Sequence, residues 1–433
     1  MKKNGFTLVE ITVCVVLLVT IFLIVVPKVN TMINNKKKNA YNSLISTVKD
    51  AAQAYVYLNV NIVDDAIESQ GYYEVSIRTL QENELLENKL ENPLTGKNIP
   101  STSIVKIIKN NEEYIYKFSL DYQYLLEHII DLYSSEETRT SNGLKKDNTP
   151  DQNIRYYGSD PNNYVSFNNE LWRIIGVFGN NVKLVRKDSL GSLSWDSSES
   201  SINGGVGINQ WGESKDADGN EYAGADLQVY LNKMYYGGTS VTCYGGTKNS
   251  TTTCPTNTLD NTAKALIDNH TWNTGAPNHS TLYNSTTQSY DTVEFYKAER
   301  GTVNGKICSS GTYCNDTVTR TTEWTGYIGL PYVTDYAYAS SENDCNTKID
   351  QSSTYKCKNN NWMHRSTSTW YMSPYAIPYN ATSVWYVYGD GSSGLSLAAD
   401  ALSAFPTIYL KSNVLIDSGK GTSSDPYILK AGL

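Results

Sequence analysis

The chain has 433 residues, enough for two or three domains, and carries a net charge of −8 at pH 7. This acidic balance weighs against nucleic acid as the main partner, so we expect no direct nucleic-acid binding. The 34 tyrosines against 7 phenylalanines, with many Asn, Ser, Thr and Gly residues after residue 150, favour a polar, β-rich, extracellular surface over a cytosolic enzyme.

The first predicted element is an apolar segment that contains a single charge. Residues 6–26 include Glu10 as their only charged residue, and Lys2 and Lys3 precede them. As a helix, a segment of this length would cross a hydrocarbon core of about 30 Å. A signal peptide or a plain anchor is the simplest interpretation, but no small-x-small cleavage site follows the segment. A carboxylate inside hydrocarbon is costly and therefore indicates a function.

The sequence GFTLVE at residues 5–10 resembles the processing motif of type IV prepilins and pseudopilins. The resemblance implies that a membrane prepilin peptidase cleaves after Gly5 and methylates the new amino group of Phe6. It also implies that Glu10 directs filament assembly, and Pro27 matches a proline common at this place in the pilin helix. An uncleaved membrane anchor is the alternative.

The position of Glu10 inside the apolar segment has a physical explanation. An ionised carboxylate in a medium of low dielectric needs a cation. The Phe6 amine of a neighbouring subunit can supply it. The Glu10 carboxylate would therefore be destabilising in the single subunit and would be stabilised by this amine in the filament. The lysines that follow the segment, Lys28 and Lys36 to Lys38, by themselves predict the opposite orientation across a membrane. The resemblance instead places the C-terminal side outside the cell.

A long helix and a small head are predicted next. Apolar residues recur at three- and four-residue steps from Ala40 to Val56, which predicts an amphipathic helix. One continuous helix over residues 6–59 would be about 80 Å long, and two separate helices are the alternative. Within residues 60–120, Ser76 can cap a helix that carries several leucines, and strand-like runs flank the turn at residues 110–111.

The second half of the chain predicts a larger domain. Residues 122–133 favour an amphipathic helix, and the polar residues 134–153 favour a linker. Beyond the linker we expect a hairpin over 164–186, helices at 227–235 and 262–268, closing strands at 405–410 and 425–429, and an antiparallel sheet with long loops. The stretches NNYVSFNNELWRIIGVF and FPTIYLKSNVLIDSGKGTSSDPYIL resemble a domain of unassigned function in surface and prepilin-like proteins of Gram-positive bacteria.

The cysteines indicate an oxidising compartment. Besides Cys14, they fall in three close pairs: Cys243 with Cys254, Cys308 with Cys314, and Cys345 with Cys357. An even number, short spacings and a leading export segment favour three disulfides formed outside the cytoplasm, with free thiols as the alternative. A zinc site is disfavoured because no pair has C-x-x-C spacing.

No catalytic motif of a common class is present, so we predict no enzyme, no metal and no cofactor. A catalytic alternative would use His270, His279 and His364. Residues 216–220 resemble the start of a calcium loop, but Glu221 and Leu227 stand where such a loop needs glycine and glutamate. The aromatic residues could build a sugar- or protein-binding face or a core, and Trp172, among apolar neighbours, is expected in the core.

The sequence therefore predicts an α+β protein with five parts. These are a leader peptide (1–5), a transmembrane and filament-core helix (6–26), the second half of this helix with a pilin-like antiparallel head (27–120), a helix and linker (121–153), and a large disulfide-stapled α+β domain (154–433).

The predicted function is that of a minor or tip subunit of a type IV filament. The subunit would lie in the cell membrane before assembly and in a surface filament afterwards. Its partners would be prepilin peptidase, other pilin subunits, the membrane, and a surface or glycan ligand of the C-terminal domain. The alternatives are a pseudopilin of a secretion or DNA-uptake system and a membrane-tethered extracellular enzyme.

Overall fold

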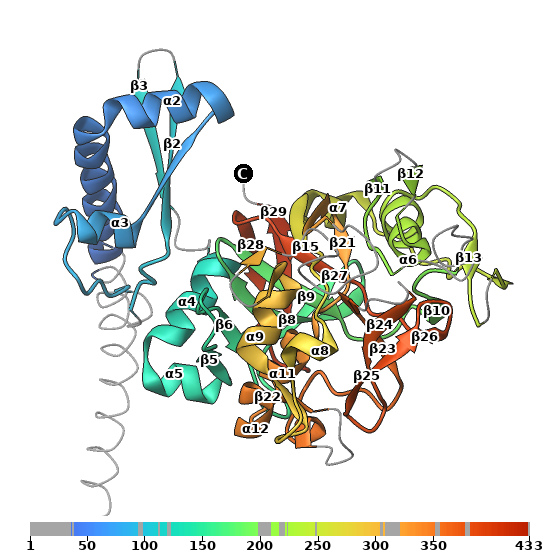
Figure 1. Cartoon of the computed structure of the whole chain (residues 1–433). Coiled ribbons are helices and arrows are strands. Elements are labelled where there is room, and N and C mark those ends of the chain that lie inside the picture. Colours follow the sequence, from blue (N-terminus) through green and yellow to red (C-terminus); the bar gives the residue numbers. More distant parts are fainter. Residues whose placement is uncertain are drawn as a thin grey trace, which may run out of the picture. The chain divides into compact units, whose positions relative to one another are not determined.

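The chain forms two compact units, Met1–Gln123 and Tyr124–Leu433 (Figure 1). The computed structural model describes residues 36, 39–93, 98–110, 113–118, 123–197, 209–215, 221–222, 224–246, 249–303, 306–307, 321–350, 356–376 and 382–431.

The first unit packs helices on an antiparallel sheet. A helix over residues 39–58 ends at a turn at Asn59, and α2 (Val60–Gln70) follows. The sheet has the order β1 (Tyr73–Ser76), β2 (Ile104–Asn110), β3 (Glu113–Phe118), which confirms the predicted hairpin. Between β1 and β2, α3 (Ile77–Glu82) begins at Ser76, whose hydroxyl accepts a hydrogen bond from the amide of Thr79.

The core of the first unit lies between helix 39–58 and the sheet. The later apolar positions of the predicted helical period are buried there: Val48, Ala51, Ala52, Tyr55 and Val56 pack with Val75, Val105 and Ile107. The earlier positions are not fully buried, since Tyr41, Leu44 and Ile45 are partly buried and Ala40 is exposed. The helix capped by Ser76 is shorter than predicted. It ends at Glu82, because Asn83 leaves the helical conformation and Glu84 has a left-handed φ of 59°.

The predicted fold class requires a correction. It was built on a continuous helix whose first half crosses a membrane, yet residues 6–26 and Pro27 lie outside the described residues. Among the described residues, we find no helix with the length and apolarity that a membrane crossing requires. The described helix 39–58 buries one face and exposes the other, which suits a helix lying on a sheet. The described fold is mixed α+β and rich in strands.

The main sheet of the second unit surrounds the hairpin of β8 and β9. Its strands follow the order β21 (Ile328–Gly329), β27 (Thr407–Leu410), β9 (Asn181–Arg186), β8 (Glu170–Phe178), β7 (Tyr164–Phe167), β29 (Tyr427–Ala431), β28 (Val414–Ser418). Strands β5 (Leu144–Lys146) and β6 (Ile154–Tyr156) pair with each other, and β6 also pairs with β8. The short strand β4 (Gln123–Tyr124) spans the boundary between the units.

The sheet is mixed and not purely antiparallel as predicted. Strand β29 runs parallel to β7, with Tyr427 opposite Val165. Because these strands are far apart in the chain, no tight hairpin forces them to be antiparallel. A second sheet has the order β10 (Ser192–Ser194), β26 (Ala401–Ser403), β23 (Thr369–Pro374), β24 (Ser383–Val387), β25 (Ser393–Leu397).

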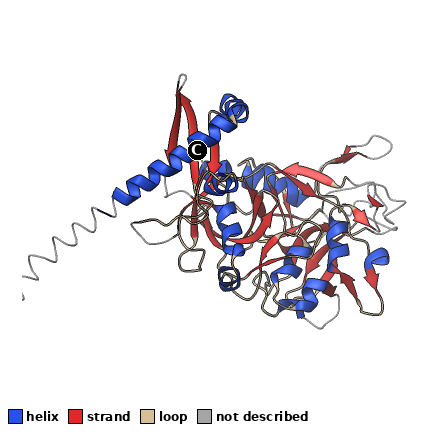
Figure 2. Ribbon diagram, turned by 90° about the vertical axis from the view of Figure 1, so that its left-hand side faces the viewer, coloured by secondary structure: helices blue, strands red, loops and turns tan. Residues whose placement is uncertain are grey.

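Short ladders and short helices complete the second unit (Figure 2). The ladders are β11 (Ser214–Lys215) with β12 (Glu221–Tyr222), β13 (Cys243–Tyr244) with β14 (Thr251–Thr252), β15 (His270–Asn273) with β20 (Glu323–Gly326), β16 (Tyr283–Asn284) with β17 (Ser289–Asp291) and β22 (Lys348–Asp350), and β18 (Thr302–Val303) with β19 (Lys306–Ile307). The helices are α4 (Leu125–Ser134), α5 (Glu136–Ser141), α6 (Asp226–Val229), the π-helix η1 (Tyr230–Tyr236), α7 (Asn261–Leu266), α8 (His279–Leu282), α9 (Thr292–Glu299), α11 (Val333–Ala339), α12 (Asn343–Thr347) and the 3₁₀ turn η2 (Lys356–Lys358).

The segment predicted as a linker belongs to the second unit. Helix α5 and strand β5 lie within residues 134–153, and β5 pairs with β6. Leu125, Ile129 and Leu144 join a core that also contains the predicted core residue Trp172, which is fully buried. Apolar burial and a backbone ladder therefore hold this polar stretch in place.

Candidate binding site

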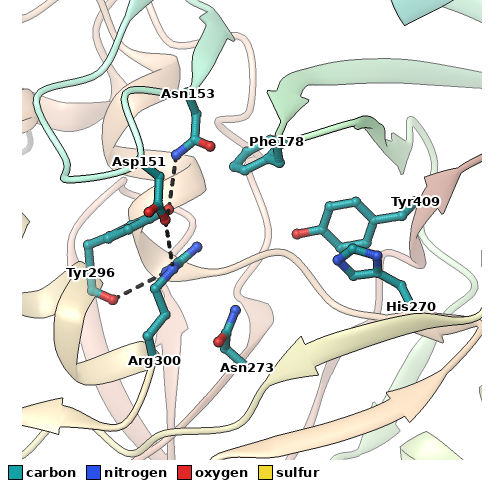
Figure 3. Close-up of a pocket in the computed structure, with 9 residues that line it drawn as sticks. Asp151, Asn153, Phe178, His270, Asn273, Tyr296, Arg300 and Tyr409 are labelled. Atoms are coloured by element: carbon teal, nitrogen blue, oxygen red, sulfur yellow. Dashed lines mark hydrogen bonds and ion pairs between the residues drawn. The ribbon is translucent and has the colours of Figure 1, made fainter. Parts of the chain in front are cut away.

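A cavity of about 400 Å³ opens in the second unit between segments that are far apart in the chain (Figure 3). This volume lies within the range of roughly 300–1,000 Å³ typical of small-molecule sites. The cavity is lined by Asp151, Asn153, Phe178, Gly179, His270, Asn273, Tyr296, Arg300 and Tyr409.

Strands, a helix and tight connections position these side chains. Asp151 and Asn153 come from the connection between β5 and β6, and Phe178 and Gly179 from the end of β8 and its turn into β9. The turn needs glycine because Gly179 has a left-handed φ of 57°. The remaining lining residues lie in or next to regular elements: His270 and Asn273 in β15, Tyr296 in α9, Arg300 directly after α9, and Tyr409 in β27.

A buried carboxylate shapes the connection that carries Asp151 and Asn153. Asp147 Oδ1 accepts hydrogen bonds from the amides of Thr149 and Asn153 at 3.2 and 3.0 Å. Its Oδ2 accepts from Arg155 Nε at 2.6 Å. Burial acts to raise the pKa of Asp147, but the charge of Arg155 and these hydrogen bonds hold it below its usual value. The ionised carboxylate thus fixes the backbone around Asp151.

A buried ion cluster supports the cavity wall from behind. Asp335 binds Arg155 Nη1 through Oδ1 at 2.7 Å and Lys183 Nζ through Oδ2 at 2.6 Å. Burial acts to raise the pKa of Asp335, but the two cations hold it below its usual value. Burial lowers the pKa of Lys183 to about 8, against the attraction of Asp335. With Asp147 included, two cations face two carboxylates, so the cluster carries no net charge.

The same cations contact the aromatic lining of the cavity. The Arg155 guanidinium lies 4.7 Å from the ring centre of Phe178, and Lys183 Nζ lies 5.3 Å from the ring centre of Tyr409. A cation on the face of an aromatic ring is attracted by the ring quadrupole. These contacts restrain the rings that form the apolar part of the wall.

One polar wall of the cavity is an interlocked group of four side chains (Figure 3). The Tyr296 hydroxyl donates to Asp151 Oδ2 at 2.6 Å and accepts from Asn153 Nδ2 at 2.9 Å. The Arg300 guanidinium lies 3.2 Å from the Tyr296 ring centre, and its Nε lies 3.5 Å from the same Asp151 oxygen. Burial raises the pKa of Tyr296 to about 12, so its hydroxyl stays a donor at neutral pH.

The opposite wall carries His270, whose ring stacks on Tyr409 with 3.7 Å between ring centres. His270 Nδ1 lies 3.0 Å from Asp268 Oδ2. Because a carboxylate only accepts, Nδ1 carries the hydrogen and Nε2 is left as an acceptor. Burial lowers the pKa of His270, although Asp268 acts in the opposite direction, so the ring is neutral at pH 7.

The lining offers several groups that can bind a ligand reversibly. It offers acceptors on Asp151 and His270, donors on Arg300, and amides that can do both. No serine, threonine or cysteine stands beside His270 in the lining, so within the described residues this base has no nucleophile to activate there.

Several predicted site residues lie outside the described residues. They are Gly5, Phe6, Glu10, Pro27, Cys308 and Cys314, together with the acidic loop at 216–220. Two of the predicted cysteine pairs are present as disulfides in the described part of the chain: Cys243–Cys254 and Cys345–Cys357.

The three histidines considered for catalysis are not gathered in the cavity. His270 lines it, whereas His364 is not part of the lining. His279 begins α8, and only its backbone is described.

Sequence reasoning missed most of the cavity residues. It placed Asp151 in a linker and gave no role to Tyr296, Arg300 or Tyr409. The one local signal is the four-residue spacing of Tyr296 and Arg300, which puts them on one face of a helix. The other lining residues meet only through the sheet topology.

In comparisons with protein-family models, curated proteins and solved structures, we found no match to this chain. Its function is therefore inferred from its own residues.

Proposed function

We propose that this protein is a pilin-like subunit of a type IV filament that carries a large exported domain. The observation behind this proposal is the motif GFTLVE at residues 5–10, which precedes an apolar segment with no further charge up to residue 26. Prepilin peptidase would cleave after Gly5 and methylate Phe6, and the subunit would lie in the cell membrane until it is assembled.

Glu10 would select the register of assembly. No lysine or arginine lies within residues 6–26 to neutralise its carboxylate once cleavage removes Lys2 and Lys3. The new amine of Phe6 on an adjacent subunit can neutralise it in surroundings of low dielectric. Docking is then favourable only where the two groups meet.

The second unit supports export and a minor or tip position. Cys243–Cys254 and Cys345–Cys357 are disulfides, and such bonds form and persist in oxidising compartments. The second unit, Tyr124–Leu433, is much larger than the first. Repeating so large a unit along a crowded filament is difficult, which favours a subunit present in few copies.

Glu10→Ala tests the proposal in cells that make the filament. We expect the variant to be cleaved and to stay with the membrane, while its amount in sheared filaments falls at least about tenfold, the loss expected when a buried charge pair is broken. Glu68→Ala is the matched control, because Glu68 is an exposed glutamate of α2. Normal incorporation of Glu10→Ala would contradict the assembly role.

Electron microscopy of filaments with a gold-labelled tag at the C-terminus tests the tip position. We expect label at filament ends or at a few sites along each filament. Even decoration along the whole length would show a major subunit instead.

A further inference from the structure

We propose that the cavity lined by Asp151, His270, Asn273 and Arg300 binds one uncharged sugar residue of a glycan. The inference rests on the proposed function in one respect: it supplies the ligand class that the exported second unit of the filament subunit would recognise. The binding chemistry itself is derived from the cavity alone.

The cavity presents polar groups of complementary kinds on facing walls (Figure 3). Asp151 and Arg300 stand on one side and His270 on the other, with Asn273 between them. A sugar hydroxyl both donates and accepts. Neighbouring hydroxyls can therefore donate to the Asp151 carboxylate and accept from the Arg300 guanidinium, while another hydroxyl donates to His270 Nε2.

These polar groups are accessible to a ligand. The side chain of Asp151 is 56 % exposed, and those of Arg300 and His270 are 19 % and 24 % exposed. Each of these side chains therefore keeps an exposed part that a ligand can contact. Phe178 and Tyr409 form the apolar background of the wall. A lining that combines several polar groups with aromatic rings matches a small ring that carries several hydroxyl groups.

The charge of the lining excludes strongly charged ligands. Arg300 and Asp151 lie 3.5 Å apart and offset each other, and the ion cluster behind the wall is balanced. A carboxylate or phosphate near Arg300 would also face the exposed Asp151 oxygens, and a cation near Asp151 would face Arg300. An uncharged ligand uses both groups without such repulsion.

The site is already arranged before a ligand arrives. Tyr296 holds Asp151 through its hydroxyl and supports Arg300 with its ring, and Arg300 Nη1 also donates to the Tyr296 carbonyl at 3.2 Å. Asp268 orients His270. Fixing these side chains in advance lowers the entropy lost on binding.

The test uses the full-length protein in a non-ionic detergent without a sugar headgroup. Binding is measured on an array of oligosaccharides that end in neutral hexoses or N-acetylhexosamines, beside others that end in uronic or sialic acids. We expect binding to a subset of the neutral oligosaccharides. Asp151→Asn should then weaken binding about tenfold or more, because an acceptor charge is lost from the sugar hydroxyls.

Asp160→Asn is a closely matched control. Asp160 is 59 % exposed, pairs with Arg173 at 3.1 Å and accepts from the Tyr164 hydroxyl at 2.7 Å, yet it does not line the cavity. The two substitutions therefore remove the same kinds of contact, and only Asp151→Asn should reduce glycan binding.

Three outcomes would overturn the inference: no binding to any neutral oligosaccharide, binding confined to the acidic ones, or equal losses for Asp151→Asn and Asp160→Asn. None of these outcomes affects cleavage after Gly5 or entry into filaments. Failure of the glycan site is thus distinguishable from failure of the proposed function.

Discussion

Glu299 at the end of α9 should make the second unit less stable as the pH rises. Its side chain is fully buried, and its carboxyl oxygens contact Thr334 Oγ1 at 2.5 Å and Ser373 Oγ at 3.0 Å. Burial raises the pKa of Glu299 from an ordinary value of 4.5 to about 7, against the opposing effects of the Thr334 hydrogen bond and the Arg300 charge.

The magnitude follows from proton linkage. The folded state keeps this proton up to about pH 7, whereas the unfolded chain releases it near pH 4.5, so folding takes up a proton between these values. Stability contributed by the neutral carboxyl is full below pH 4.5 and is lost as the pH rises through 7. At about 1.4 kcal/mol for each pKa unit, the loss is roughly 3 kcal/mol.

Glu299→Gln should remove this loss, because the amide cannot ionise. The free energy of unfolding is measured in urea at pH 5 and pH 8 by tryptophan fluorescence. This signal reports on the second unit, since all 8 tryptophans follow residue 123. Relative to the wild type, the variant should gain about 2.5 kcal/mol between the two pH values, because part of the loss already occurs below pH 5.

Glu294→Gln on the same helix is the control, since Glu294 is 43 % exposed and pairs with Lys297 at the surface. It should leave the pH dependence unchanged. If Glu299→Gln and the wild type lose the same stability between pH 5 and pH 8, burial does not hold a proton on Glu299 and the reasoning fails.

The same structure makes three further predictions. Lys183→Met should destabilise the second unit by about 3–5 kcal/mol in the urea assay, because Asp335 loses one of its two buried cations; a change below about 1 kcal/mol would mean that the pair is not desolvated. Replacing both cysteines of the Cys345–Cys357 disulfide by serine should cost about 3 kcal/mol by loop entropy, and an unchanged urea midpoint would rule this out. His270 should titrate below its usual pKa of 6.5 in NMR spectra of its ring, and Asp268→Asn should lower the value further, whereas a higher value in that variant would contradict the burial effect.

Elements defined by local patterns could be predicted from the sequence. The apolar period of helix 39–58 identified its buried face, and the strand-like runs around residues 110–111 and 179–181 became the hairpins of β2 with β3 and β8 with β9. These signals are local, because helix and strand periods depend on neighbours a few residues apart.

Elements held by backbone pairing or by distant contacts could not be predicted. Strand β5 has little apolar character, and its place is set by its ladder with β6. The helix predicted at 227–235 is present, but most of it is the π-helix η1, which no simple period indicates.

The candidate site depends on topology even more strongly. Asp151, Arg300 and Tyr409 meet because the β5–β6 connection, the end of α9 and β27 come together. No residue spacing in the sequence indicates that these three residues lie close together. The N-terminal motif is the opposite case. A processing enzyme recognises a short contiguous stretch, so GFTLVE can be identified from the sequence without knowledge of the fold.

Mass spectrometry of the mature N-terminus, on protein isolated from cells that contain the processing machinery, tests the central claim most directly. We expect a chain that begins with N-methylated Phe6 and lacks residues 1–5. A membrane-bound chain that still begins with Met1 would contradict it.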